Sequence, residues 1–168
     1  RDRADIAVAF GSGDWSPYRA TRLFPEQVTP VCTPAFRNAH PDMSAADLRS
    51  LPLLHVQATY PERWLDWNGW FAKHGLNAPP EDEGMTFNSY ALVIHAALSH
   101  QGVALGWVPL VDELVATGQL VRLAEPPVTT ERGYFLVYPA ARPEAPAAPA
   151  FRRWLFAACG CSANAAAY

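Results

Sequence analysis

Charged side chains are scarce in this chain of 168 residues. They make up 17% of it, against about 25% in ordinary globular domains. Thirteen basic side chains stand against sixteen acidic ones, which gives a formal net charge of −3. Nucleic-acid binding needs a basic excess that neutralises phosphates, so it is excluded as the main feature of this sequence. Half of the residues are hydrophobic, which excludes intrinsic disorder and provides a core for one domain or two small lobes.

Cysteines and long apolar runs are also few. The three cysteines are Cys32, Cys159 and Cys161, and an odd number without a second metal-ligand pair favours neither a disulfide framework nor a zinc site. Residues 84–111 lack Asp, Glu, Lys and Arg, yet polar residues interrupt them well before the ~18 apolar residues that a membrane span needs. No apolar signal region opens the sequence, so we expect a cytoplasmic protein with no membrane contact.

The clearest pattern is a strand–helix–strand unit in the middle of the chain. We expect a strand at 85–88, a helix capped by Asn88 or Ser89 and ending near residue 100, and a second strand at 103–107. Tight joints around a helix of this length are typical of a right-handed crossover between parallel strands. Parallel strands are buried on both faces, which explains why 84–111 carry no charge.

Shorter elements are expected on both sides of this unit, so the predicted fold class is α/β. The further strands are expected at 5–10, 28–32 (interrupted by Pro30), 53–57, 120–123 and 134–138. The further helices are expected at 44–51 behind a capping box, at 61–74 with an aromatic stripe, from Pro109 to Gly118, and in a closing segment with the inner stripe Phe151, Trp154, Leu155 and Ala158. Loops or polar connections are expected at 15–22 and 125–132.

Proline-containing stretches divide this fold into two expected lobes. In chain order we expect part of lobe one (1–27), a crossing segment (28–34), lobe two (35–123), a return crossing (124–132), the remainder of lobe one (133–158) and a frayed tail (159–168). Lobe one has too few strands and helices to cover a core of its own.

Five stretches in this order resemble one protein family. They are Asp5–Trp15 (DIAVAFGSGDW), Val28–Pro34 (VTPVCTP), Asp47–His55 (DLRSLPLLH), Trp64–Trp67 (WLDW), and Phe87–Tyr90 (FNSY) followed by Ala96–Gly106 (AALSHQGVALG). Over residues 5–158 the chain resembles the effector domain of LysR-type transcriptional regulators. The last stretch is similar to the branch that includes glycine-cleavage activators and β-lactamase regulators.

The resemblance implies a two-lobed, periplasmic-binding-protein-like (type 2) α/β fold whose first lobe is incomplete at the N-terminus. It implies a domain that senses a small-molecule effector, forms a homo-oligomer and needs no cofactor. Promoter DNA would be bound only through a helix-turn-helix domain that this chain lacks. The alternative is a free-standing solute-binding lobe of the transport type. An enzyme is not expected, because the sequence shows no nucleophile–base motif, paired catalytic carboxylates or metal-ligand spacing.

Eight residues are candidate ligand contacts, and none is a candidate catalytic or metal-binding group. They are Asn88, Ser89, Tyr90, Thr33, Gly13, Trp15, His55 and Trp107. Ser89 either holds an anionic group at a helix N-terminus or is a plain N-cap; we expect it in a groove between the lobes, near the 11–15 loop and Thr33. The aromatic residues either pack in the core or form a cage for an ammonium group. The expected effector is a polar metabolite with a carboxylate or a quaternary ammonium.

Overall fold

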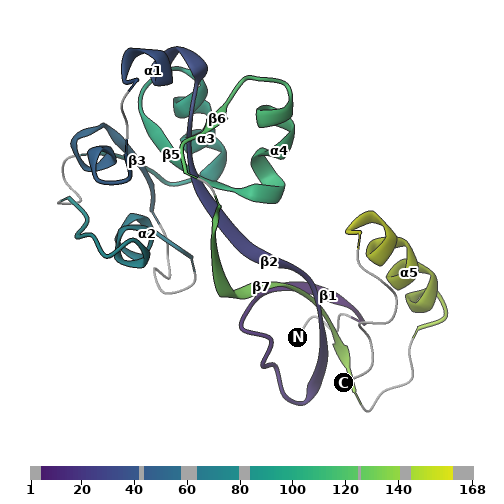
Figure 1. Ribbon diagram of the computed structural model, residues 1–168. Coiled ribbons are helices and arrows are strands. Elements are labelled where there is room, and N and C mark those ends of the chain that lie inside the picture. Colours follow the sequence, from purple (N-terminus) through teal and green to yellow (C-terminus); the bar gives the residue numbers. More distant parts are fainter. Residues whose placement is uncertain are drawn as a thin grey trace. The chain divides into compact units, whose positions relative to one another are not determined.

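The computed structural model describes residues 5–41, 44–57, 64–79, 84–124, 126–140 and 145–160. The chain divides into two compact units. Unit 1 consists of Arg1–Glu26 and Thr129–Tyr168, and unit 2 consists of Gln27–Val128. The long strand β2 (Tyr18–Cys32) runs from unit 1 into unit 2 (Figure 1).

Unit 2 is built on a mixed sheet that contains three parallel strands. These are β3 (Leu53–Val56), β4 (Met85–Phe87) and β5 (Val103–Trp107), joined by the second half of β2 and by the short β6 (Val121–Arg122). Strand β3 pairs in parallel with both β4 and β5, while β2 pairs antiparallel with β5 and β6. Helix α3 (Tyr90–Leu98) connects β4 to β5, which confirms the predicted crossover between parallel strands.

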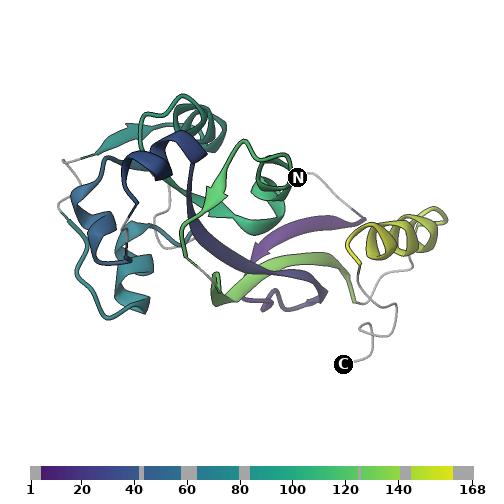
Figure 2. The same ribbon diagram turned by 45° about the horizontal axis from the view of Figure 1, so that its top comes forward.

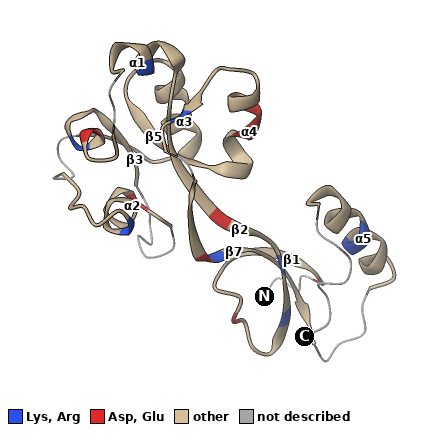
Figure 3. Ribbon diagram, in the orientation of Figure 1, with Lys and Arg blue, Asp and Glu red and all other residues tan. Residues whose placement is uncertain are grey.

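Two hydrophobic cores lie on opposite faces of this sheet. Leu54 packs with residues of α3 and α4 (Val108–Ala116), whereas its neighbour Leu53 packs with α2 (Trp67–Lys73) and η1 (Asp47–Ser50). Successive strand residues point to opposite faces, so adjacent leucines serve separate cores. Burial on both faces accounts for the lack of charge along β3 and β5 (Figure 3).

Unit 1 combines the first half of β2 with β1 (Ala7–Gly11), β7 (Val128–Pro139) and helix α5 (Ala148–Ala158) (Figure 2). Strand β1 pairs antiparallel with residues 133–137 of β7. A small core of Leu23, Leu136, Tyr138 and Phe156 joins α5 to these strands.

A buried carboxylate lies at the end of the β2 segment that belongs to unit 1. Glu26 is 1% exposed. Its Oε2 accepts hydrogen bonds from the hydroxyl of Thr130 at 2.6 Å and from Nε of Arg132 at 3.0 Å. The charge is therefore matched inside the unit, as burial of a carboxylate requires.

The strands β2 and β7 are longer than predicted. The expected loop at 15–22 is wrong from Tyr18 onward, and the expected connection at 125–132 is wrong from Val128 onward. Pro30 does not interrupt β2: it lies opposite Leu105, and its carbonyl accepts from the N–H of Leu123 at 2.9 Å. The N–H and C=O of a residue in an antiparallel ladder point to the same side, so the missing N–H of Pro30 removes no bond to β5.

Two predicted helices differ from the structure in their start or their buried face. Helix α2 begins at Trp67 behind the cap Asp66; its expected start, Pro61, lies outside the described residues, and Trp64 precedes the helix. On α5, the expected inner stripe is wrong for Phe151 and Trp154, which are 42% and 63% exposed, and for the exposed Ala158. Ala148 and Phe156 are buried instead, and Leu155 packs against the core as predicted. The last eight residues of the expected tail, 161–168, lie outside the described part of the chain.

The predicted capping box is present at the start of η1. The N–H of Ser44 donates to Oδ2 of Asp47 at 2.8 Å, the Ser44 hydroxyl donates to the same oxygen, and the N–H of Asp47 donates back to the hydroxyl at 3.4 Å. These hydrogen bonds from Ser44 favour the charged carboxylate and lower the pKa of Asp47 below its usual value. The helix is a single 3-10 turn, shorter than the predicted 44–51.

Candidate functional site

The carboxyl ends of β3, β4 and β5 meet at one edge of the sheet because the three strands are parallel. The N–H of Gln57, just after β3, donates to the carbonyl of Phe87 at the end of β4 at 2.7 Å. Asn88 and Ser89 follow β4 directly, and Trp107 ends β5. Three of the predicted ligand contacts therefore lie at this carboxyl edge, where ligands of α/β proteins bind.

Ser89 occupies the N-cap position of α3 in extended conformation, with φ −145° and ψ 136°. Its carbonyl accepts from the N–H groups of Leu92 and Val93, but its side chain makes no capping hydrogen bond. The first turn of α3 contains no acidic residue, so the positive end of the helix dipole meets no carboxylate there. The hydroxyl and the first-turn N–H groups could therefore bind a negatively polarised group.

Tyr90 fixes the end of β5. Its hydroxyl accepts a hydrogen bond from the backbone N–H of Trp107 at 3.2 Å, and the two rings are perpendicular with centroids 5.0 Å apart. Trp64 also packs against Trp107: the centroids of the two rings lie 5.8 Å apart, and the ring planes make an angle of 88°. Trp107 is 5% exposed, so the three rings form one packed aromatic group.

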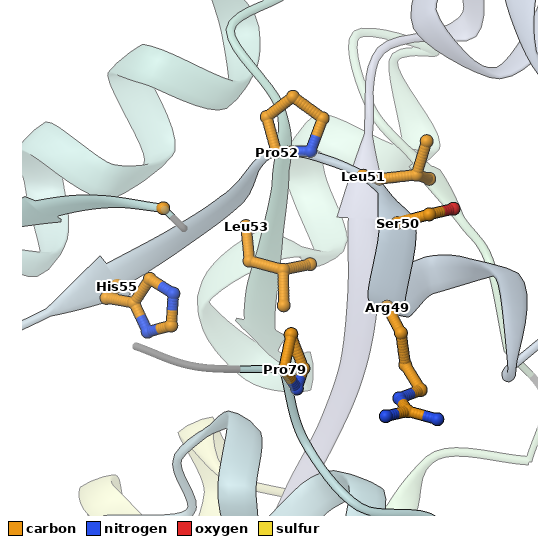
Figure 4. Close-up of a pocket in the computed structure, with 8 residues that line it drawn as sticks. Arg49, Ser50, Leu51, Pro52, Leu53, His55 and Pro79 are labelled. Carbon is orange, nitrogen blue, oxygen red and sulfur yellow. The ribbon is translucent and has the colours of Figure 1, made fainter. Parts of the chain in front are cut away.

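His55 lines three small cavities that are formed by described residues along strand β3. A cavity of about 190 Å³ lies around the start of β3, lined by Arg49, Ser50, Leu51, Pro52, Leu53, His55, Pro79 and Gly84. In Figure 4, His55 and Arg49 stand on opposite sides of Leu53 and Pro79. A cavity of about 40 Å³ lies at the carboxyl edge, lined by Leu54, His55, Val56, Leu65, Asp66, Trp67, Tyr90, Val93, Leu105 and Trp107. A third of about 20 Å³ also has His55 and Asp66 in its wall. His55 thus lines cavities of unit 2, and whether it is a ligand contact or a polar group with its own partner in the fold stays a prediction.

Thr33 lies at the opposite end of α3 from Ser89. Its hydroxyl oxygen caps the short helix α1 (Pro34–Ala39) by accepting from the N–H of Phe36 at 3.3 Å, and it is 2.5 Å from Nδ1 of His100, just past α3. A helix of nine residues spans about 14 Å, so the expected proximity of Thr33 to Ser89 is wrong.

The reason is the direction of β2. This strand runs antiparallel to β5, from Val28 opposite Trp107 to Val31 opposite Ala104. Strand β2 therefore passes the carboxyl edge first, and Thr33, which follows its last residue, lies beyond the amino end of β5.

Gly13 and Trp15 belong to unit 1, whereas the other six candidates belong to unit 2. The Trp15 ring packs edge-on against Phe135, with centroids 5.3 Å apart. Gly13 has φ +100°, and a Cβ there would lie 3.0 Å from the ring of Phe135. Both residues thus have a packing role in unit 1, and their role as ligand contacts stays a prediction.

Sequence reasoning missed Asp66, which lines the cavity at the carboxyl edge. Its Oδ1 accepts from the N–H of Gly69 at 2.7 Å and caps α2. An aspartate directly before Trp67 was a usable N-cap signal, but the proline at position 61 indicated an earlier helix start.

The described residues contain no group of three or more His, Cys, Asp or Glu side chains that could hold a metal ion. Among the same residues, no helix is long and apolar enough to cross a membrane.

The family model and the curated relatives that this chain matches all indicate the same protein family. Residues 1–160 match the LysR substrate binding domain. The chain is 36% identical over 159 residues to the HTH-type transcriptional activator AmpR of Rhodobacter capsulatus, covering 92% of this chain and 50% of that protein. It is 29% identical over 157 residues to the glycine cleavage system transcriptional activator of Escherichia coli K12, covering 93% and 50%. The chain thus spans about half the length of the curated relatives it matches.

Solved structures agree with this similarity. The AmpR effector binding domain from Citrobacter freundii superposes with a TM-score of 0.74 at 25% identity, covering 93% of this chain and 74% of that chain. The AmpR effector domain of Pseudomonas aeruginosa gives 0.72 at 29% identity, covering 93% and 72%. The predicted periplasmic-binding-protein-like α/β fold and the predicted branch are confirmed, and a transport lobe is not favoured. The chain belongs to the LysR substrate-binding domain family and is the effector-binding domain of a LysR-type regulator.

Proposed function

We propose that this chain senses a small polar effector and supports homo-oligomerisation in a regulator that binds promoter DNA through a separate helix-turn-helix domain. Its family and the activators among its relatives support this proposal. The regulator acts in the cytoplasm, where promoter DNA is found, and releases its effector chemically unchanged. We propose that the chain crosses between lobe one and lobe two at two segments, residues 28–34 and residues 124–132.

The proposed effector site is the carboxyl edge of the parallel strands in unit 2. The observation that carries it is the N-terminus of α3, where the Ser89 hydroxyl makes no capping bond and no acidic residue occupies the first turn. A carboxylate on the effector would accept from this hydroxyl and from first-turn N–H groups, an arrangement worth about 0.3–1 kcal/mol at exposed sites. Asn88, Tyr90, His55 and Trp107 are proposed as further contacts of the effector.

Two effector chemistries fit this edge. A carboxylate suits the start of α3, and an ammonium group suits the aromatic rings of Tyr90 and Trp107. Gly13 and Trp15 are proposed as further contacts contributed by unit 1. Self-association is proposed through the outer face of α3, where Leu92 is 48% exposed and His95 is exposed.

The test uses the intact regulator and its promoter DNA. Fluorescence anisotropy of labelled DNA is measured against a panel of amino acids, carboxylates and quaternary amines, and at least one compound is expected to change promoter binding. Ser89→Ala should weaken the response to that compound about tenfold, equivalent to about 1.4 kcal/mol, without changing DNA binding in its absence.

Ser99→Ala is the matched control, because Ser99 is exposed at the other end of the same helix. It should leave the response unchanged. A ligand at 100 times its dissociation constant should also stabilise the protein by about 2.7 kcal/mol. If no compound in the panel changes promoter binding or stability, the sensing proposal fails.

A further inference from the structure

The 40 Å³ cavity at the carboxyl edge has an unusual charge balance. Of the ten described residues that line it, Asp66 carries the one formal charge, and no lysine or arginine is among them. The remaining wall consists of aliphatic side chains, the His55 imidazole, and the aromatic residues Trp67, Tyr90 and Trp107. A carboxylate among aromatic and aliphatic groups attracts a cation and repels an anion.

The Asp66 carboxylate has one oxygen available. Its Oδ1 accepts from the N–H of Gly69, and no described residue donates to Oδ2. Asp66 is exposed, so solvent and solutes reach it without a change in the fold. The cap holds the side chain in place, and the second oxygen could accept from a cationic N–H donor.

The aromatic wall is rigid. The indole Nε1 of Trp67 donates to the carbonyl of Leu54 at 3.1 Å inside the core. Trp107 is held by the hydroxyl of Tyr90 and by the edge-on packing of Trp64. Since these rings are fixed before any ligand arrives, binding would require little ordering of the wall.

Hydrogen bonding decides which cation is favoured. The cavity of about 40 Å³ exceeds the ~10–15 Å³ that one water molecule needs, so a small cationic head group can enter it. A primary ammonium has N–H groups that can donate to Oδ2 of Asp66, whereas a quaternary ammonium has none. The site therefore favours a primary ammonium over a quaternary one.

We propose that this cavity binds the primary ammonium group of an amino compound, with Asp66 as its counter-ion and the rings of Tyr90 and Trp107 as its wall. The inference rests on the proposed effector site and narrows the effector to compounds that carry such a group. It also chooses between a primary and a quaternary ammonium, which the aromatic residues alone leave open.

The test titrates the full 168-residue chain with methylammonium chloride at constant ionic strength and follows the indole and amide ¹H–¹⁵N signals of Trp67, Tyr90 and Trp107. Methylammonium is expected to shift these signals saturably, and tetramethylammonium chloride is expected to shift them far less at the same concentration. Asp66→Asn should weaken methylammonium binding about tenfold, equivalent to about 1.4 kcal/mol, because asparagine keeps the cap on α2 but removes the charge.

Glu113→Gln is the matched control: it removes the same charge from an exposed position of α4 and should not change binding. The two salts on the unaltered chain test the inference even if a variant fails to fold. Tetramethylammonium binding as tightly as methylammonium, or unchanged methylammonium binding by Asp66→Asn, would each overturn it.

The outcome is separable from that of the proposed function. An effector without an ammonium group that changes promoter binding would overturn the inference and leave the sensing function intact. If methylammonium binds as expected but no compound changes promoter binding by the regulator, the inference stands and the sensing function is overturned.

Discussion

Gly102 joins α3 to β5 at a point where the backbone leaves no room for a side chain. A Cβ at this position would overlap the carbonyl oxygen of Pro52 and lie 3.1 Å from its carbonyl carbon. The same oxygen accepts the hydrogen bond from the N–H of Val103 at 2.9 Å, which aligns the start of β5 with the start of β3. In Gly102→Ala, this peptide group would have to move, because a backbone atom cannot rotate away as a flexible side chain can.

The expected cost follows from these contacts. Forcing a methyl group into a packed position costs about 1–3 kcal/mol, and weakening one buried backbone hydrogen bond adds about 1 kcal/mol. We therefore expect Gly102→Ala to lower the free energy of unfolding by about 2–4 kcal/mol. Because β3 and β5 carry His55 and Trp107, the variant should also perturb the carboxyl edge.

Gly118→Ala is the control. Gly118 has φ +73°, but a Cβ there would meet nothing within 4 Å, so it bears only the left-handed backbone penalty of about 1–2 kcal/mol. Urea unfolding followed by tryptophan fluorescence measures both variants, since Trp67, Trp70 and Trp107 lie in the core of unit 2. A Gly102→Ala protein within about 1 kcal/mol of the parent, or as stable as Gly118→Ala, would refute the steric argument.

Three further outcomes are expected. Glu26→Gln removes the buried charge that Arg132 contacts and should cost about 1.5–3 kcal/mol in urea unfolding; a cost below about 0.5 kcal/mol would contradict the pairing. Burial raises the pKa of Cys32 to about 11, so its thiol should stay protonated at pH 8 and react with maleimide no faster than the chain opens, as followed by peptide mass spectrometry. The lowered pKa of Asp47 means that its capping box stabilises the fold above the ordinary aspartate pKa and loses this effect as the pH falls through the lowered one; Ser44→Ala should move the NMR titration of Asp47 to higher pH.

The strand–helix–strand unit could be predicted because its signals agree. Apolar residues at 103–107 fill a strand that is buried throughout, and Ser89 marks the start of α3. Strand β2 could not be predicted in full, since residues 18–22 are largely exposed and lack a continuous apolar pattern. On α5, two faces carry large apolar side chains, and only packing shows that the face with Phe156 is buried and that Trp154 is exposed.

The candidate site was predictable where it depends on one continuous segment. Asn88, Ser89 and Tyr90 follow one strand and stay together, and the return of β5 brings Trp107 to Tyr90. Thr33 was misplaced because its position depends on the direction of β2 relative to β5, which the sequence does not state. Asp66 was missed because its cap and its cavity arise from α2, whose start the proline at 61 obscured.

The division of the chain has a consequence for synthesis on the ribosome. Unit 2 is one continuous segment, Gln27–Val128, whereas unit 1 is made of the two segments that flank it. Strand β1 pairs with residues 133–137, so after it leaves the exit tunnel it must wait until more than a hundred later residues have been made. At about 5–20 residues per second, this delay is on the order of 10 seconds, far longer than a small domain needs to fold. Most of this interval is the synthesis of unit 2 itself, which ends at Val128, shortly before residues 133–137 are made. Strand β1 therefore has no partner while unit 2 is being made, and an emerging chain would present β1 to chaperones during that interval.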